Sequence, residues 1–168
     1  MESLTHRKRA CIMIMDQDLD FGIKLADWLA AHRYQVVLVR SLQAAITEFP
    51  DIRPHAVLIG LAQTGSAFPI HLQELLRAIE TGGSPVPVIT MGNPTSGALA
   101  NLLYGGVIRH VHLSIRPSEF AYIGRLLRAE LNAATASPSA DPRHSSSRLT
   151  ENRVQARTTF REAATWIG

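Results

Sequence analysis

Five short apolar runs alternate with stretches in which apolar residues recur every three or four positions. The runs cover residues 10–15, 34–39, 56–61, 86–91 and about 107–115. A continuous apolar run of this length is typical of a strand buried on both faces, and the stripes are typical of helices that bury one face. The alternation predicts an α/β doubly wound fold, with a five-stranded parallel sheet between two layers of helices. Asp18 or Asp20 is the candidate cap of the first helix and Ser41 that of the second, and the second helix is expected to end before Pro50.

The residues that follow these runs identify a candidate site. The carboxyl ends of parallel strands meet at one edge of the sheet, where ligands bind in folds of this class. Asp16 follows the first run, Gly60 lies near the end of the third, Gly92 follows the fourth and Arg116 follows the fifth. We therefore expect these four residues to lie close together.

Asp16, Gly60 and Arg116-Pro117, in this order and with this spacing, resemble the receiver domain of bacterial response regulators. The resemblance covers residues 8–134 and implies the flavodoxin-like strand order 2-1-3-4-5. In that family two acids after the first strand hold Mg²⁺, and an aspartate at the end of the third strand accepts a phosphoryl group. The fifth strand is followed by Lys-Pro.

The sequence departs from the family at the positions that do the chemistry. Gly60 stands in place of the phosphorylated aspartate, Gln17 in place of the second acid, Gly92 in place of a threonine or serine, and Arg116 in place of the lysine. Phosphoryl transfer to the protein needs a nucleophile, and glycine has none. Asp16 is left as the main anionic ligand. The resemblance thus implies a degenerate phosphate pocket that binds Mg²⁺ poorly, with no cofactor and no enzymatic activity.

The function that the resemblance implies is a cytoplasmic signal-transduction module that works without phosphorylation, through contact with a protein partner or a second copy. In the family, the fourth helix, fifth strand and fifth helix form the contact surface. The corresponding residues here are Leu99, Leu102, Tyr104, Ile108, Tyr122 and Arg125.

The chain beyond residue 134 has a different composition. Residues 135–148 hold five serines and two prolines and predict a flexible linker. Residues 149–168 regain a helical stripe, which predicts a C-terminal amphipathic helix that docks on its own domain, a second copy or a partner. Its candidate contact residues are Phe160, Ala164, Trp166 and Ile167.

Two alternative functions follow from other features. The vacated pocket around Asp16, Gly60 and Arg116 could serve a small-ligand sensor. The net charge of +3, with basic residues at 7–9 and in the last 20 residues, could serve a nucleic-acid-associated regulator.

No apolar run is long enough to span a membrane, so no membrane partner is expected. A single cysteine, Cys11, is compatible with a reducing cytosol.

Overall fold

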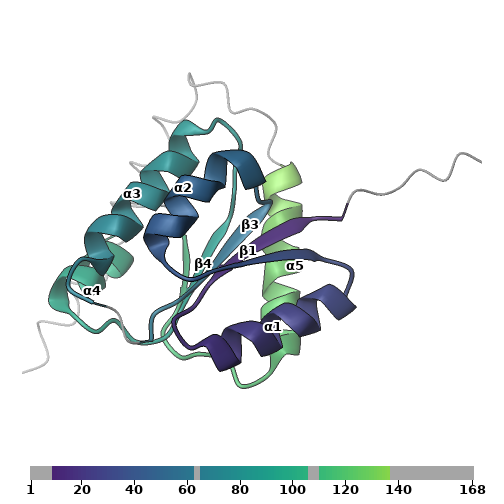
Figure 1. Ribbon diagram of the computed structural model, residues 1–168, viewed down its shortest axis with the longest axis horizontal. Coiled ribbons are helices and arrows are strands. Elements are labelled where there is room, and N and C mark those ends of the chain that lie inside the picture. Colours follow the sequence, from purple (N-terminus) through teal and green to yellow (C-terminus); the bar gives the residue numbers. More distant parts are fainter. Residues whose placement is uncertain (1–8, 63–64, 106–109, 137–168) are drawn as a thin grey trace, which may run out of the picture. The chain divides into compact units, whose positions relative to one another are not determined.

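The computed structural model describes residues 9–62, 65–105 and 110–136. Strands and helices alternate along these residues (Figure 1). The strands are β1 (Cys11–Met15), β2 (Gln35–Val39), β3 (Ala56–Gly60), β4 (Val88–Met91) and β5 (Val111–Leu113). The helices are α1 (Leu19–Ala31), α2 (Leu42–Ile52), α3 (Phe68–Thr81), α4 (Gly97–Tyr104) and α5 (Phe120–Ala136).

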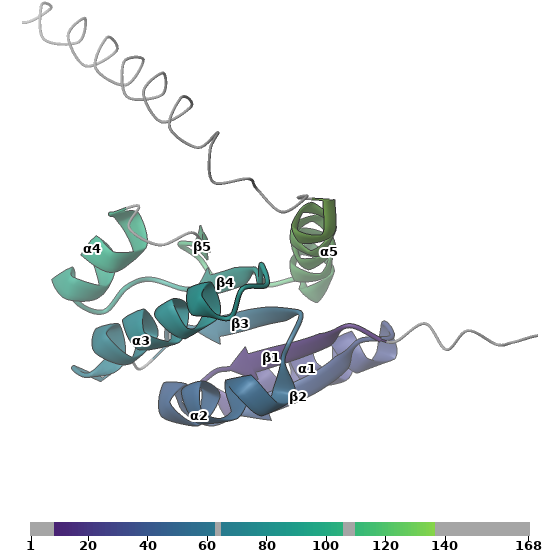
Figure 2. The ribbon, with the colours of Figure 1, turned by 90° about the horizontal axis from the view of Figure 1, so that it is seen from above.

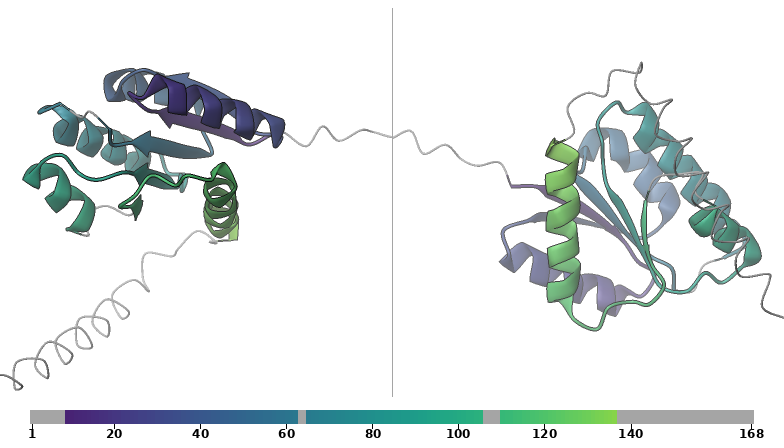
Figure 3. Two further views of the ribbon diagram at one scale, coloured as in Figure 1. Left: turned by 90° about the horizontal axis from the view of Figure 1, so that it is seen from below. Right: turned by 180° about the vertical axis from the view of Figure 1, so that it is seen from behind.

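The five strands form one parallel sheet in the order β2-β1-β3-β4-β5. The predicted fold class and strand order are therefore confirmed. The sheet lies between two helical layers, with α2, α3 and α4 on one face and α1 and α5 on the other (Figures 1 and 2). The view from behind in Figure 3 shows α5 and α1 covering their face of the sheet.

Successive residues of the strands enter two separate hydrophobic cores. Met13, Met15 and Ile59 pack toward α2, α3 and α4, whereas Ile14 and Leu58 pack toward α1 and α5. This is the alternation that a pleated strand requires. If the alternation continues by one residue in each strand, the side chains at positions 16 and 60 lie on the side of α1 and α5.

Three of the helices begin at a residue whose side chain caps the first turn. Asp18 accepts a hydrogen bond from the N–H of Phe21 at the start of α1, and Ser41 and Ser96 cap α2 and α4 in the same way. Each cap satisfies a backbone donor that has no partner within the helix. The caps predicted at Asp18 and Ser41 are present, and they fix where the chain leaves the carboxyl edge of the sheet.

Some predicted boundaries were wrong. We expected α2 to end before Pro50, but the helix includes Pro50 and ends at Ile52. Pro50 lacks the N–H that would bond to the preceding turn, but Phe49 and Ile52 on either side of it pack against the core. Arg53 then adopts a left-handed conformation with φ of 47°, and its N–H donates to the carbonyl of Phe49.

The C-terminal part of the described chain also differs from the prediction. The described part of β5 is shorter than the expected run, and residues 106–109 lie outside the described residues. Helix α5 ends at Ala136, close to the predicted domain boundary at residue 134. The chain divides into two units between residues 134 and 135. Most of the predicted linker and all of the predicted C-terminal helix, with Phe160, Ala164, Trp166 and Ile167, lie outside the described residues. None of the described helices is long and apolar enough to cross a membrane.

Candidate functional site

Asp16 and Gly60 lie side by side at the carboxyl edge of the sheet. Met15 pairs with Ile59 in the register of β1 and β3, so residues 16 and 60 are the next pair along. The side chain of Asp16 is fully buried and leans over Gly60. A Cβ atom on residue 60 would lie only 2.7 Å from Oδ1 of Asp16 and nearer still to Cγ and Oδ2. The carboxyl group of Asp16 therefore occupies the space that a side chain at position 60 would need.

Arg116 holds this carboxyl group from the loop between β5 and α5. Its Nη2 donates to Oδ1 of Asp16 at 3.1 Å, and its Nη1 donates to Oδ2 of Asp18 at 2.9 Å. The N–H of Asp18 also donates to Oδ1 of Asp16 at 2.9 Å. One planar guanidinium thus binds two carboxylates through separate nitrogens, which a lysine ammonium could not do with the same geometry.

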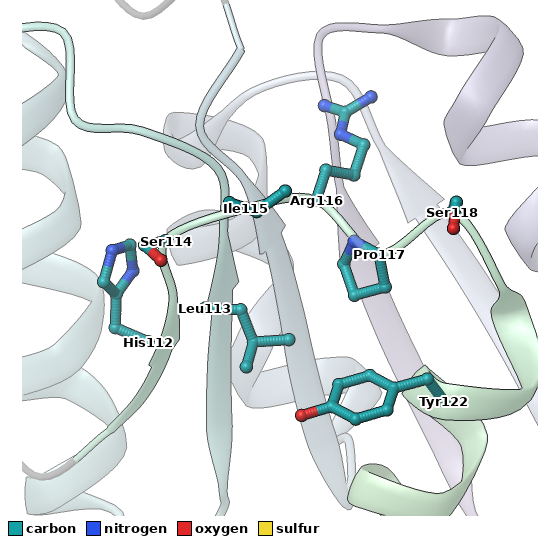
Figure 4. Close-up of a pocket in the computed structure, with 8 residues that line it drawn as sticks. All are labelled: His112, Leu113, Ser114, Ile115, Arg116, Pro117, Ser118 and Tyr122. Carbon is teal, nitrogen blue, oxygen red and sulfur yellow. The ribbon is translucent and has the colours of Figure 1, made fainter.

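Aromatic rings cover the ion pairs. The guanidinium carbon of Arg116 lies 4.1 Å from the centre of the Phe21 ring, a cation–π contact. Phe21 in turn packs edge-on against Phe120 of α5, with ring centres 5.6 Å apart. Figure 4 shows the guanidinium of Arg116 extending away from Pro117 and Tyr122. Phe21 of α1, which Phe120 of α5 supports, thus packs on the guanidinium of Arg116.

The two carboxylates have different electrostatic environments. Burial raises the pKa of Asp16, against the opposing effects of the Asp18 N–H and of Arg116. The hydrogen bond from the N–H of Phe21 is the main cause of the lowered pKa of Asp18, and Arg116 lowers it further. Oδ2 of Asp16 is buried and has no hydrogen-bond partner among the described residues. The N–H of Asp18 and Nη2 of Arg116 both donate to the other oxygen, Oδ1.

Asp18 and Phe21 were missed as site residues by the sequence analysis, which identified Asp18 only as a possible helix cap. The useful signal was an acid two positions after Asp16. Gln17, which we placed in the pocket, is exposed.

Gly92 has φ of 113°, a conformation that favours glycine, and its N–H donates to the carbonyl of Leu113. Gly92 therefore has a backbone role in joining the ends of β4 and β5.

A second polar cluster links β4, β5 and α4. Nδ1 of His112 lies 2.9 Å from Oγ1 of Thr90, and Nε2 lies 3.3 Å from the hydroxyl of Tyr104. Thr90 is fully buried, and Thr90 and His112 are paired residues of β4 and β5. Among the residues that the structure describes, no group of three or more His, Cys, Asp or Glu side chains could hold a metal ion.

A shallow groove of about 520 Å³ runs along β5 and the loop before α5 (Figure 4). It is lined by His112, Leu113, Ser114, Ile115, Arg116, Pro117, Ser118 and Tyr122. Ile115 is 76% exposed and Tyr122 45% exposed, and Tyr104, which contacts His112, is 62% exposed. Large exposed apolar side chains therefore gather around this groove.

The predicted contact surface needs one correction. Leu99 is fully buried, because it lies on the same side of α4 as Leu103 and packs into the core beside α3. Leu102 is partly buried against the same core. The guanidinium of Arg125 lies 6.0 Å from the ring of Tyr122 on the exposed side of α5. Ile108 lies outside the described residues.

No protein-family model and no curated protein matches the sequence. Solved structures match it well in three dimensions. A receiver domain protein from Methanospirillum hungatei JF-1 has a TM-score of 0.60 at 12% identity and covers 76% of this chain and 97% of its own. A two-component response regulator from Clostridium difficile has a TM-score of 0.58 at 16% identity and covers 77% and 100%. The chemotaxis protein CheY4 of Vibrio cholerae has a TM-score of 0.58 at 11% identity and covers 72% and 98%. The chain thus has the fold of response regulator receiver domains.

Proposed function

We propose that this protein is a cytoplasmic signal-transduction module of the response-regulator type that acts through protein contact and without phosphorylation. The observation that carries this proposal is the position of the Asp16 carboxyl group. The carboxyl group fills the space beside Gly60, and the guanidinium of Arg116 neutralises its charge. Phosphorylation of a receiver requires a free carboxylate at that place and a metal beside it. Here the space holds an ion pair of the chain's own residues.

The same geometry argues against Mg²⁺ as a cofactor. Hard cations bind through several oxygen ligands, mostly carboxylates. Asp16 and Asp18 at this edge are already bound to Arg116. A magnesium ion would have to displace a guanidinium held by two carboxylates and an aromatic ring. We therefore propose that no metal is needed, and that the protein has no enzymatic activity.

The test of phosphorylation independence is incubation of the full chain with acetyl phosphate and Mg²⁺, followed by intact-mass spectrometry. A receiver domain that has the acceptor aspartate serves as a parallel control. We expect the control to gain the mass of one phosphoryl group and this protein to keep its original mass. A phosphoryl adduct that maps within residues 8–134 would contradict the proposal.

The groove beside β5 is the best-supported contact surface. Tyr104, Ile115 and Tyr122 are exposed around it, and exposed apolar clusters rimmed by polar groups are typical of protein interfaces. Ile115 offers a specific test because Ile70 of α3 is a matched control, 61% exposed and outside the groove. We propose that a second copy of the chain is one occupant of this surface.

Sedimentation equilibrium of the wild type, Ile115→Asp and Ile70→Asp measures this directly. We expect Ile115→Asp to weaken self-association by at least about tenfold, the effect of roughly 1.4 kcal/mol, and Ile70→Asp to leave it unchanged. Equal effects of the two substitutions, or a wild-type chain that stays monomeric at every concentration, would contradict self-association through this groove.

The alternative functions receive less support. For a ligand sensor, the space at Gly60 is filled by Asp16, and the charge of Arg116 is already matched by two carboxylates. Most of the basic residues behind the nucleic-acid alternative, at 7–8 and beyond 150, lie outside the described residues.

A further inference from the structure

His112 connects the interior of the sheet to the proposed contact surface. One ring nitrogen reaches the buried hydroxyl of Thr90, and the other reaches the exposed Tyr104 at the end of α4. The rings of Tyr104 and His112 also meet edge-on, with centres 5.2 Å apart. His112 itself lines the groove with Ile115 and Tyr122 (Figure 4). A change at His112 therefore alters contacts both with Thr90 in β4 and with Tyr104 at the surface.

The proton positions in this cluster depend on the charge of the imidazole. A neutral histidine has one donor and one acceptor nitrogen, so it can accept from one of the two hydroxyls while it donates to the other. An imidazolium donates from both nitrogens. Thr90 and Tyr104 must then both accept, and Thr90 has to direct its own proton to the carbonyl of Val111, at 3.5 Å. The hydroxyl proton of Tyr104 must turn away from His112.

We propose that His112 is a proton-operated switch that sets the state of Tyr104 on the contact surface. In the neutral form, Tyr104 can donate its proton inward to His112. In the protonated form, Tyr104 can only accept from His112 and presents its proton outward, and the groove gains a positive charge.

The surroundings of His112 place the switch below neutral pH. Burial lowers the pKa of His112 from its ordinary value of 6.5, and the charge of His110 on the approach to the same strand lowers it further. Among the described residues, the other titratable or charged groups at the groove are Tyr104 from α4, Tyr122 from α5 and Arg116 from the loop between β5 and α5. Arg116 is itself paired with Asp16 and Asp18, away from the imidazole.

The consequence for binding rests on the proposed function. In a symmetric pair of copies, the same patch of each chain faces the other. Protonation would then place an imidazolium on both sides of one contact, and like charges repel. Self-association through the groove should therefore weaken as the pH falls through the midpoint of His112.

The test is an NMR titration of the full chain between pH 8 and pH 5, following the imidazole of His112 and the ring of Tyr104. The variants are His112→Gln and, as a matched control, His71→Gln on α3. We expect the Tyr104 resonances to follow the midpoint of His112, below pH 6.5. We expect this titration to disappear in His112→Gln and to persist in His71→Gln. A Tyr104 ring that does not titrate in the wild type, or that titrates unchanged in His112→Gln, would overturn the proposal.

Thr90 offers a second measurement that does not depend on replacing the histidine. Thr90→Val removes the buried oxygen that accepts from the imidazolium and should lower the midpoint of His112, whereas Thr90→Ser should retain it. Equal midpoints in the two variants would contradict the link to β4. The two proposals fail separately: a chain that never self-associates refutes the surface, while an unresponsive Tyr104 refutes the switch.

Discussion

Gly60→Ala is the substitution that best tests how the site is built. The backbone of Gly60 has no unusual φ, so alanine meets no backbone strain there. Its new methyl group would lie 2.7 Å from Oδ1 of Asp16, where ordinary contacts begin at 3.4 Å. Oδ1 must therefore retreat by about 0.7 Å, and Cγ and Oδ2 by more. Oδ1 cannot move so far and keep its bonds to both Arg116 and the Asp18 N–H.

Two opposing effects set the magnitude. Alanine loses less backbone entropy than glycine on folding, which favours the variant by about 0.5–1 kcal/mol. Breaking a buried ion pair costs about 3–5 kcal/mol, because an uncompensated charge remains buried. Partial loss of the pair should therefore destabilise Gly60→Ala by about 2–4 kcal/mol. Gly97→Ala is the control, because no atom lies within 4 Å of a Cβ at that position, and it should show only the entropic gain of about 0.5–1 kcal/mol.

Urea unfolding of both variants measures these values, and a double-mutant cycle assigns the cause. In an Asp16→Ala background the space beside residue 60 is empty, so Gly60→Ala should then cost less by about 2 kcal/mol. The reasoning is refuted if Gly60→Ala is as harmless as Gly97→Ala. It is also refuted if the cost of Gly60→Ala is the same with and without the Asp16 side chain.

Two further predictions concern the helices beside the site. Gly124→Ala on α5 would place a methyl group 2.7 Å or less from two atoms of the Trp28 ring of α1. We therefore expect the free energy of unfolding in urea to fall by about 1–3 kcal/mol. A loss of stability no greater than that of Gly97→Ala would contradict this close packing. Asp18→Asn keeps a capping oxygen but removes the charge that binds Arg116. Because the folded pKa of Asp18 is lowered, its ionised form stabilises the protein above its ordinary value of 3.8, and this stabilisation is lost as the pH falls below that value. The wild type should therefore be more stable than Asp18→Asn at neutral pH, and this difference in stability should shrink on acidification. Unfolding at a series of pH values measures it. A difference that stays constant with pH would show that the charge of Asp18 is not the source of the stabilisation.

The fold was predictable because its signals are local. Each apolar run and each helical stripe is contained within a few residues, and caps such as Asp18 and Ser41 act on the next turn of the chain. The strand order came from the resemblance to receivers and was confirmed. Pro50 misled the prediction of a helix end, because a proline disturbs only the turn before it, and Phe49 and Ile52 on either side of it pack against the core.

The site was predictable only in part. The sequence predicts that Asp16, Gly60 and Arg116 lie at one edge of the sheet, and the structure places them there. It did not reveal that Asp16 leans into the space at Gly60, because this depends on side-chain conformation across two strands. Nor did it reveal that Arg116 also binds Asp18. Leu99 was misplaced by the analogy with the family, although its spacing of four from Leu103 already indicated a buried face.

The ion pair of Arg116 also has a consequence for how the chain reaches its folded state. Asp16 and Arg116 are 100 residues apart in the sequence, and β5 joins the sheet only through β4. Contacts this distant form after the loop between them has been closed, at an entropic cost that nearby contacts do not carry. During synthesis, Asp16 is therefore without its guanidinium until the ribosome has passed residue 116. We infer that β1, β3 and β4 assemble around an unpaired carboxyl group, and that docking of the β5–α5 segment is the late step that neutralises it.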